Sequence, residues 1–456
     1  MEADPSDPSK LVGFDVEIAE LIASELGRTP RFVQVAFASL DQSAIRGDFD
    51  IGLCGMEDTP QRRAAVAASV PYYEFREVLT VRSADREHFQ SLADLHGRRV
   101  ATLGSTIAYE ILVKAGQEHG ITAVSYDDDV HPYTDLLLGR VDAVLLDNVL
   151  ADRSMRRNPG LHTHSEGLVR GHYVVITAPE NTELRDQVDE ILRRAMQDGR
   201  LESILRKWDI WTEDQTSHHA RVLAAAGNPR PAGSTPAPTS VWKTTVTYFP
   251  SLLQAAVVTL LLSCLAMALA VLLGVVIATG RVYGGPLTRT FLTAYVELVR
   301  GTPVLLQLFV VYYGLAAVVR LPAFAAALLG LGLNYAAYES EIYRSALEAV
   351  PKGQLEASRI LGFREWQVLR LIRGPQAFRL ALAPMTNDFV ALLKDSSLVS
   401  VLTVVELTKR TQIFAANIGS WVIPGALCAA LYLLMSLPLG HLARRLEARW
   451  KAPTTS

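Results

Sequence analysis

Polar side chains that could hold a small charged ligand follow three predicted strands in the first half of the 456-residue chain. Arg62, Thr106 and Asp147 each lie shortly beyond a short apolar run. A guanidinium group and the free amides of a helix N-terminus suit a carboxylate, whereas a lone aspartate suits an ammonium group. Together these groups suit a zwitterion such as a free amino acid. Spacing alone leaves open the commoner alternative, that they are solvated or capping residues.

The hydrophobic pattern predicts the elements that must position these side chains. Residues 15–26 carry apolar side chains at helical spacing, and Gly27 can end that helix. Short apolar or alternating runs predict four strands, at 31–37, 50–54, 99–103 and 141–146. Repeated strand–turn–helix units predict an α/β domain with largely parallel strands, in which ligands collect at the carboxyl ends of the strands.

Seven short motifs in a fixed order resemble the polar amino acid family of periplasmic solute-binding proteins, over about residues 10–211. The motifs are Lys10–Asp15, Thr59–Arg62, Pro71–Tyr73, Leu92–Gly97, Gly104–Thr106, Val141–Asp147, and Asp198–Leu201 with Lys207 and Trp208. The resemblance implies a bilobed α/β binding domain over 1–215. One lobe would be built from about 1–81 plus 178–215, and the other from about 84–175.

The resemblance also implies roles for residues that match the family's motifs by position. Arg62 would hold the α-carboxylate of the ligand with two hydrogen bonds. Thr106 would assist through its backbone amide from the other lobe, and Asp147 would take the α-ammonium group. The full ligand-binding set carried over in this way is Phe37, Gly55, Glu57, Arg62, Ser105, Thr106 and Asp147. Phe37 could equally be a core residue.

The sequence departs from this family in two places. Glu57 stands where Ser or Thr is usual. It could form an ion pair with Arg62 or Arg63, which we favour, or it could select a ligand with a cationic side chain. The family also begins with a strand and a pocket aromatic, whereas residues 1–9 are acidic and Pro-rich. We therefore expect the functional protein to begin upstream of Met1, with a signal peptide and that strand.

Net charge and composition narrow the class of protein. Lys and Arg number 44 and Asp and Glu number 47, so the net charge is −3, which argues against a nucleic-acid partner held by a basic surface. Hydrophobic residues make up 50% of the chain, which excludes disorder throughout. The three cysteines are too few for a disulfide framework.

From about residue 248 the sequence changes to long apolar runs. Four runs lack charges, a fifth is interrupted by three charges, and each is long enough or nearly long enough to cross a bilayer. They predict about five transmembrane helices, drawn from 252–278, 301–319, 321–338, 380–407 and 411–440. The preceding segment, 216–247, is rich in Pro, Ala and Gly and predicts a flexible linker.

The segment 353–375 resembles the coupling-loop signature of ABC importer permeases. The matching residues are Gly353, Glu356, Ala357, Ser358, Gly362 and Pro375. A short helix followed by a glycine bend can protrude from the membrane, and its charged face can sit in a groove on a partner ATPase. Together with further motifs, the resemblance implies a permease domain over 248–450.

Two pairs of opposite charges lie within the predicted membrane domain. Glu297 with Arg300, and Glu341 with Arg344, are spaced i,i+3, so the members of each pair can meet on one helix face. Charges in or beside a membrane span are costly and often functional. We favour structural roles, as ion pairs at the cytoplasmic interface or contacts between permease subunits, over a direct place on the substrate path.

Basic residues indicate the orientation of the membrane domain. They cluster after the first predicted span, around 353–375 and near the C-terminal end. With five spans, all three clusters fall on the cytoplasmic side if the domain 1–215 lies outside. We therefore expect a multi-pass protein of the bacterial inner membrane, in contact with lipid, with its N-terminal domain on the periplasmic side.

These observations predict a fused receptor and permease subunit of an ABC importer for a polar amino acid. The chain has no GxxxxGK(S/T) phosphate loop, so ATP and Mg²⁺ are expected on a separate cytoplasmic ATPase subunit. No enzyme activity, bound cofactor or metal is expected of this chain, and His218 and His219 are interpreted as part of the linker. Five spans make half a pathway, so a second permease subunit is expected, most simply another copy.

Two alternatives use the same bilobed binding fold. One is a ligand-gated channel or receptor, and the other is a dehydratase enzyme. The coupling-loop motif and the C-terminal position of all predicted spans argue against the channel. The attached membrane domain and the lack of a convincing acid–base pair argue against the enzyme.

Overall fold

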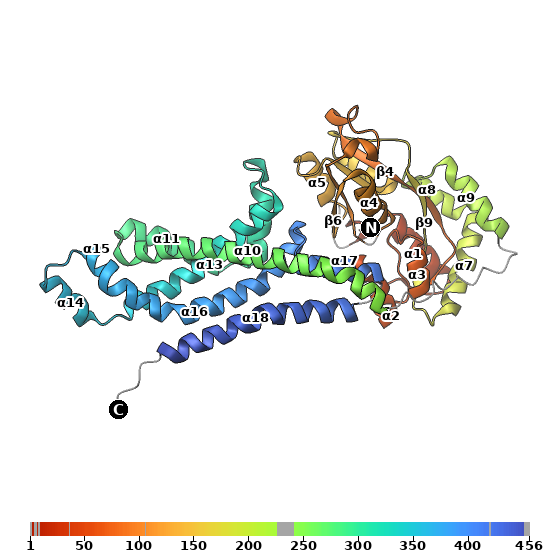
Figure 1. The fold of residues 1–456 in the computed structure, drawn as a ribbon. Coiled ribbons are helices and arrows are strands. Elements are labelled where there is room, and N and C mark those ends of the chain that lie inside the picture. The colour runs from red at the N-terminus through yellow and green to blue at the C-terminus, as the bar shows by residue number, and fades with distance from the viewer. Residues whose placement is uncertain are drawn as a thin grey trace. The chain divides into compact units, whose positions relative to one another are not determined.

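A computed structural model describes residues 2–3, 7, 10–35, 37–104, 106–225, 241–418 and 421–450 (Figure 1). The chain divides into two units. One comprises Met1–Thr245 with Ile413–Trp421, and the other comprises Val246–Gln412 with Val422–Ser456. The first unit combines strands and helices, and the second is helical. This confirms the predicted fold class, an α/β domain followed by a helical membrane-type domain.

The main sheet of the first unit has six strands in the order β6-β5-β7-β4-β8, with β9 also paired to β4. Strand β5 runs parallel to β6 and β7, but β4 is antiparallel to β7, β8 and β9. The sheet is therefore mixed, and the expectation of largely parallel strands is wrong. Only short 3-10 turns lie between β4 and β5, so no crossover helix constrains β4 to be parallel. The strands are β4 (Tyr73–Arg82), β5 (Arg99–Leu103), β6 (Thr122–Tyr126), β7 (Ala143–Asp147), β8 (Leu161–Thr163) and β9 (Val169–Tyr173).

The segments around this sheet test the remaining strand and helix predictions. The predicted helix at 15–26 is α1, Phe14–Glu25. No strand forms over the described residues of 31–37, whose side chains are largely exposed, and 50–54 contributes only an isolated bridge from Gly52 to Ile176. At the start of the chain, β1 (Glu2–Ala3) pairs with β2 (Leu11–Val12), so the expectation that residues 1–9 supply no strand is wrong. One further strand pair is β3 (Ala67–Ala68) with β10 (Ile176–Thr177).

Two groups of core residues lie on either side of the middle of β4. Tyr73 and Phe75 belong to a cluster with α1 and the later helices of the unit. Leu79 and Val81, from the same strand, belong to a different cluster with β5 and α4. Strand β4 thus passes from one core to the other. The helices of this unit are α2 (Leu40–Arg46), α3 (Pro60–Ala65), α4 (Ile107–His119), α5 (His131–Leu137), α6 (Asn148–Arg157), α7 (Thr182–Gln197), α8 (Arg200–Lys207) and α9 (Glu213–Ala224).

Helix α9 replaces the beginning of the predicted linker. His218 and His219 lie in this helix and are buried, so the interpretation of the two histidines as linker residues is wrong. Burial is possible because Gln215 and both histidines share the face of α9 that packs on β4. The Pro-rich segment 226–240 lies outside the described residues.

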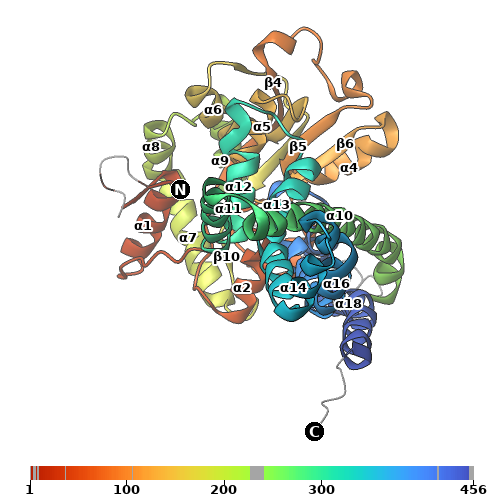
Figure 2. The same cartoon turned by 90° about the vertical axis from the view of Figure 1, so that its left-hand side faces the viewer.

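The second unit consists of long helices, with α16 packed beside α13 and α18 (Figures 1 and 2). Its main helices are α10 (Val241–Tyr283), α11 (Pro286–Arg300), α12 (Val304–Tyr312), α13 (Ala323–Glu348), α14 (Lys352–Ile360), α15 (Glu365–Val368), α16 (Gly374–Asp395) and α18 (Val422–Trp450). Helix α17 (Leu407–Ile418) ends four residues before α18 begins, so the predicted continuous run 411–440 is broken.

Two of the described helices are long and apolar enough to cross a membrane, Tyr248–Tyr283 and Val422–Leu442. A third candidate is the pair α11 and α12, which is bent by 106°. Helices α13 and α16 do not meet the same criterion: α13 carries charges such as Glu341 in its C-terminal part, and α16 carries Asp388 within it. The predicted count of five therefore depends on these two polar helices.

Candidate functional site

Arg62 is positioned by a short helix that its own neighbours begin. Thr59 caps α3, and its side-chain oxygen accepts a hydrogen bond of 3.2 Å from the Arg62 backbone amide. The guanidinium is buried, with only 6% of the side chain exposed. Its Nε lies 3.0 Å from Asp41 Oδ1, and its Nη1 donates to the backbone carbonyl of Glu57. Arg62 is thus a buried cation with one acidic partner.

Glu57 does not form the ion pair that we favoured from the sequence. Arg62 pairs with Asp41, and Arg63 pairs with Asp58. The Nη2 atom of Arg63 lies 2.6 Å from Oδ2 of Asp58. The Glu57 carboxylate instead accepts a hydrogen bond of 2.6 Å from the backbone amide of Ile107, the first residue of α4. A helix N-terminus offers unpaired amides and a partial positive charge, which explains this preference for the carboxylate.

Thr106 and Asp147 both sit at the beginning of a helix. The Thr106 hydroxyl donates to the carbonyl of Leu103 over 2.7 Å and accepts from the amide of Tyr109, so it caps α4. Asp147 ends β7 and caps α6 by accepting a hydrogen bond of 2.9 Å from the amide of Leu150. Both side chains are buried, so local capping and a place beside a ligand are compatible roles for each.

Glu77 is a buried carboxylate that the sequence analysis missed. It lies directly opposite Asp147 in the β4–β7 pairing, and it is 1% exposed. Burial raises the pKa of Glu77, and the nearby negative charges of Glu57 and Asp147 raise it further. Tyr73–Arg82 carries four charged residues, and nothing in its local sequence distinguishes Glu77 as the buried carboxylate.

The three carboxylates Glu57, Glu77 and Asp147 therefore share one buried region. Burial raises the pKa of Glu57, and it raises the pKa of Asp147 to about 6. Tyr173 lies beside this group, and its side chain favours the ionised form of Asp147 and so lowers the pKa of that carboxyl. Arg62 acts on Glu57 as the nearby positive charge. If all three were ionised they would outnumber the one guanidinium, so burial favours their protonated forms and a bound cation would favour their ionised forms.

Three further residues were predicted to contact the ligand, namely Phe37, Gly55 and Ser105. Phe37 is half-buried and packs against the core cluster that contains Leu40 and Met56, which favours its core alternative. Gly55 has φ +64°, so glycine meets a backbone requirement there, and a Cβ would make ordinary contact with the ring of Tyr173. Ser105 lies outside the described residues.

In the helical unit, the predicted coupling segment forms a helix with one buried and one exposed face. Leu355 and Ser358 of α14 are buried, whereas Glu356 and Ala357 are exposed. At the C-terminal end of α14, Ile360 and the following Leu361 are 85% and 77% exposed. Exposed aliphatic side chains beside exposed charges are typical of a surface that contacts another protein.

Gly362 lies in the bend after α14, and Pro375 lies where a π-helical turn gives way to α16. Gly362 has φ +81° and follows the C-terminal end of α14, a conformation in which a side chain would strain the backbone. Pro375 lies in the first turn of α16, directly after the π-helical turn Leu369–Arg373. Gly353 lies at the exposed beginning of α14.

Only one of the two predicted charge pairs forms among the described residues. Glu341 and Arg344 lie 2.8 Å apart, and Arg281 from α10 also binds Glu341. By contrast, the guanidinium of Arg300 lies over the ring of Tyr338, 5.4 Å from its centre, and no ion pair joins it to Glu297 in this part of the chain. The aromatic face of Tyr338 is thus an alternative partner for the positively charged Arg300.

Comparison with known proteins gives the same two-part division. Residues 2–210 match the family described as bacterial extracellular solute-binding proteins, family 3, and residues 270–452 match the family described as binding-protein-dependent transport system inner membrane component. The glutamine transport system permease protein GlnP of Escherichia coli (strain K12) is 34% identical over 214 residues, which are 46% of this chain and 97% of that protein.

Two further proteins illustrate the range of similarity. The L-cystine transport system permease protein TcyB of Bacillus subtilis (strain 168) is 34% identical over 206 residues, covering 44% of this chain and 88% of that protein. Among solved structures, a mutant of ArgBP from T. maritima is 30% identical, with a TM-score of 0.42, and the match covers 45% of this chain and 88% of that chain.

Proposed function

The chain belongs to the amino-acid ABC importers and fuses a solute-binding domain to an inner-membrane permease domain, and we propose that its ligand is an amino acid with a cationic side chain. In this proposal Arg62 holds the α-carboxylate and Asp147 holds the α-ammonium group. The backbone amide of Thr106 assists Arg62. Glu57 then remains for the side chain of the ligand.

The observation that supports a cationic ligand is the excess of buried carboxylate. Glu57, Glu77 and Asp147 lie together, and Arg62 already has Asp41 as a partner. A neutral amino acid brings one positive and one negative group and leaves this excess unchanged. A ligand with a further cationic group offsets it, so its binding is favoured over that of a neutral ligand of the same shape.

Arginine and citrulline provide the test of this charge preference, because they differ mainly by a guanidinium against a neutral urea group. We expect the purified full-length protein to bind arginine at least about tenfold more tightly than citrulline, measured by calorimetry, since hydrogen bonds to charged groups contribute about 1.5–3 kcal/mol. In Glu57→Gln the preference should largely disappear. Equal affinities in the unaltered protein would contradict the cationic ligand and leave a neutral polar amino acid.

Ligand affinity is also expected to depend on pH. The pKa of Asp147 is raised to about 6, chiefly by burial, so in the free protein this carboxylate takes up a proton as the pH falls through that value. A bound ammonium group requires the ionised form, so Asp147 lowers the affinity in acid, and the pKa of Glu57, raised by burial to about 8, extends this fall to higher pH. Linkage predicts a loss of at least about tenfold between about pH 7.5 and about pH 5, measured by titration in matched buffers. A flat profile over this range would contradict the role of Asp147.

The transport cycle requires partners of defined chemistry. A separate cytoplasmic ATPase would bind ATP and Mg²⁺ and contact the exposed face of α14, including Glu356 and Ile360. A second permease subunit, most simply another copy, would complete the pathway within the lipid bilayer. The solute-binding domain would lie on the periplasmic side, where it meets the ligand before transport. The exposed aliphatic and charged surface of the coupling segment supports the ATPase contact.

A further inference from the structure

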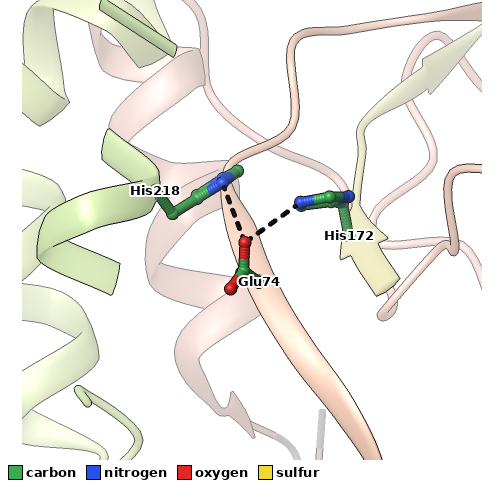
Figure 3. Close-up of side chains that lie close together, drawn as sticks. All are labelled: Glu74, His172 and His218. Atoms are coloured by element: carbon green, nitrogen blue, oxygen red, sulfur yellow. Dashed lines mark hydrogen bonds and ion pairs between the residues drawn. The ribbon is translucent and has the colours of Figure 1, made fainter. Parts of the chain in front are cut away.

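Three potential metal ligands converge at one end of the β4–β9 pair (Figure 3). Glu74 of β4 lies directly opposite His172 of β9, and His218 approaches them from α9. Glu74 Oε2 is 3.3 Å from His172 Nε2 and 3.8 Å from His218 Nδ1. The three ligand atoms all lie within 4.8 Å of one another, and Glu74 and His218 are buried.

A hydrogen bond made by the Nε2 atom of His218 determines whether its other ring nitrogen, Nδ1, can accept. His218 Nε2 lies 3.1 Å from the backbone carbonyl of Pro71. A carbonyl oxygen only accepts, so Nε2 carries the hydrogen and Nδ1 of the neutral ring has a lone pair. Two acceptors then face each other across 3.8 Å, an arrangement that a cation between them would stabilise.

We propose that Glu74, His172 and His218 form a Zn²⁺ site. Two imidazoles and one carboxylate are a donor set that Zn²⁺ commonly accepts, with water as a fourth ligand. Bonds of about 2.0–2.2 Å in tetrahedral geometry separate ligand atoms by about 3.4 Å. This is close to the 3.3 Å and 3.8 Å that separate Glu74 Oε2 from His172 Nε2 and His218 Nδ1. The carbonyl of Pro71 would serve as the outer hydrogen-bond partner that orients a zinc-binding histidine.

Two arginines already contact the Glu74 carboxylate and determine how the metal could enter. Arg170 Nη1 lies 2.9 Å from Oε1, the oxygen away from the histidines, and can stay there when the metal binds. Arg221 binds Oε2, the oxygen that the metal needs, but its side chain is 56% exposed and can turn into solvent. Asp214, 3.4 Å from Arg170, offsets part of the positive charge that remains. Zn²⁺ and Arg221 therefore compete for one oxygen.

A metal at this site would join α9 to the strand pair β4–β9. Strand β4 contributes residues to both core clusters of the α/β unit, and α9 is the last described helix before the linker segment. The metal would thus fix the helix from which the chain continues to the membrane domain against the strand that joins the two cores. This role is separate from ligand recognition and does not rest on the proposed cationic ligand.

Zinc titration of the full-length protein tests this site. After chelator treatment and purification in detergent, we expect one Zn²⁺ per chain by calorimetry, and Co²⁺ in its place should give visible absorption typical of a low-coordinate site. His172→Ala and His218→Ala should each weaken binding at least about 100-fold, since losing even an outer hydrogen-bond partner costs about 10–100-fold. Arg221→Ala should tighten binding, because it removes the competitor for the Glu74 oxygen.

His162→Ala is the matched control, because His162 and His164 form another histidine pair, with ring centres 5.0 Å apart, in the same unit. We expect it to leave zinc affinity unchanged. Circular dichroism of each variant should match that of the unaltered protein, and His172, whose side chain is 36% exposed, is the substitution least disturbing to the fold. The proposal is overturned if the unaltered chain binds no stoichiometric zinc, if folded His172→Ala retains it, or if Arg221→Ala weakens it.

Discussion

Arg62→Ala is expected to weaken amino-acid binding by at least about 30-fold while the α/β unit stays folded. A buried guanidinium that pairs with the ligand carboxylate contributes strongly, and truncating one member of such a pair costs about 2–5 kcal/mol, or about 30- to 4,000-fold. The fold should survive, because the Thr59 cap receives its hydrogen bond from the Arg62 backbone amide, which alanine retains. Asp41 would lose its partner, but it is 26% exposed and can be hydrated. Calorimetry with arginine on the full-length protein measures the effect.

Arg63→Ala is the matched control for this substitution. Arg63 is the next residue in α3 and pairs with Asp58 rather than Asp41, so its loss removes the same charge from the same helix without removing the proposed ligand contact. Arg62→Lys should give an intermediate affinity, because it keeps the charge but loses the bidentate fork. Unchanged affinity in folded Arg62→Ala would show that the ligand carboxylate binds elsewhere.

The parts of this site that depend on local sequence could be predicted. Thr59, Thr106 and Asp147 each begin a helix, and a capping residue is identified by its immediate neighbours. The strand 99–103 and the helix 15–26 were likewise predictable, because apolar periodicity over a few turns or pleats determines them. What these residues have in common is that their partners lie within a few positions along the chain.

The parts that depend on distant partners could not be predicted. Asp41 is 21 residues from Arg62, and Glu57 meets the amide of Ile107, 50 residues away. Glu77 was overlooked because its opposition to Asp147 follows from the antiparallel pairing of β4 with β7, and the sequence favoured parallel strands. Burial of such groups is decided by tertiary packing, which a hydrophobic pattern does not specify.

In the membrane domain, helical spacing alone likewise did not determine which charged residues pair. The i,i+3 spacing correctly indicated that Glu341 and Arg344 could pair, but it said nothing of Arg281, which reaches Glu341 from another helix. The identical spacing of Glu297 and Arg300 produces no such pair among the described residues, because Tyr338 offers Arg300 an aromatic face. Helical spacing therefore predicts which residues can meet, whereas neighbouring helices decide which of them do.

Charge reversal on the exposed face of α14 is expected to stop transport without affecting ligand capture. Glu356 is exposed and lies beside the aliphatic surface of Ile360 and Leu361, so Glu356→Arg alters the proposed ATPase contact without opening a cavity. Gly362→Asp should act on the same contact differently, because φ is +81° and a side chain there shifts the bend that follows α14. Coupling energies of about 1–3 kcal/mol between sites correspond to about 5- to 150-fold, so ATP-driven uptake should fall by at least about fivefold in each variant.

Proteoliposomes that contain the full-length protein and its ATPase measure uptake, and calorimetry on the same preparations measures ligand affinity. Glu20→Arg, a charge reversal on the exposed face of α1, serves as the control and should leave both quantities unchanged. Loss of uptake with unchanged ligand affinity in both α14-region variants would separate a coupling defect from a binding defect, since the proposed ligand groups all lie in the α/β unit. Normal uptake in both would mean that the segment 353–375 is not the contact through which ATP hydrolysis drives transport.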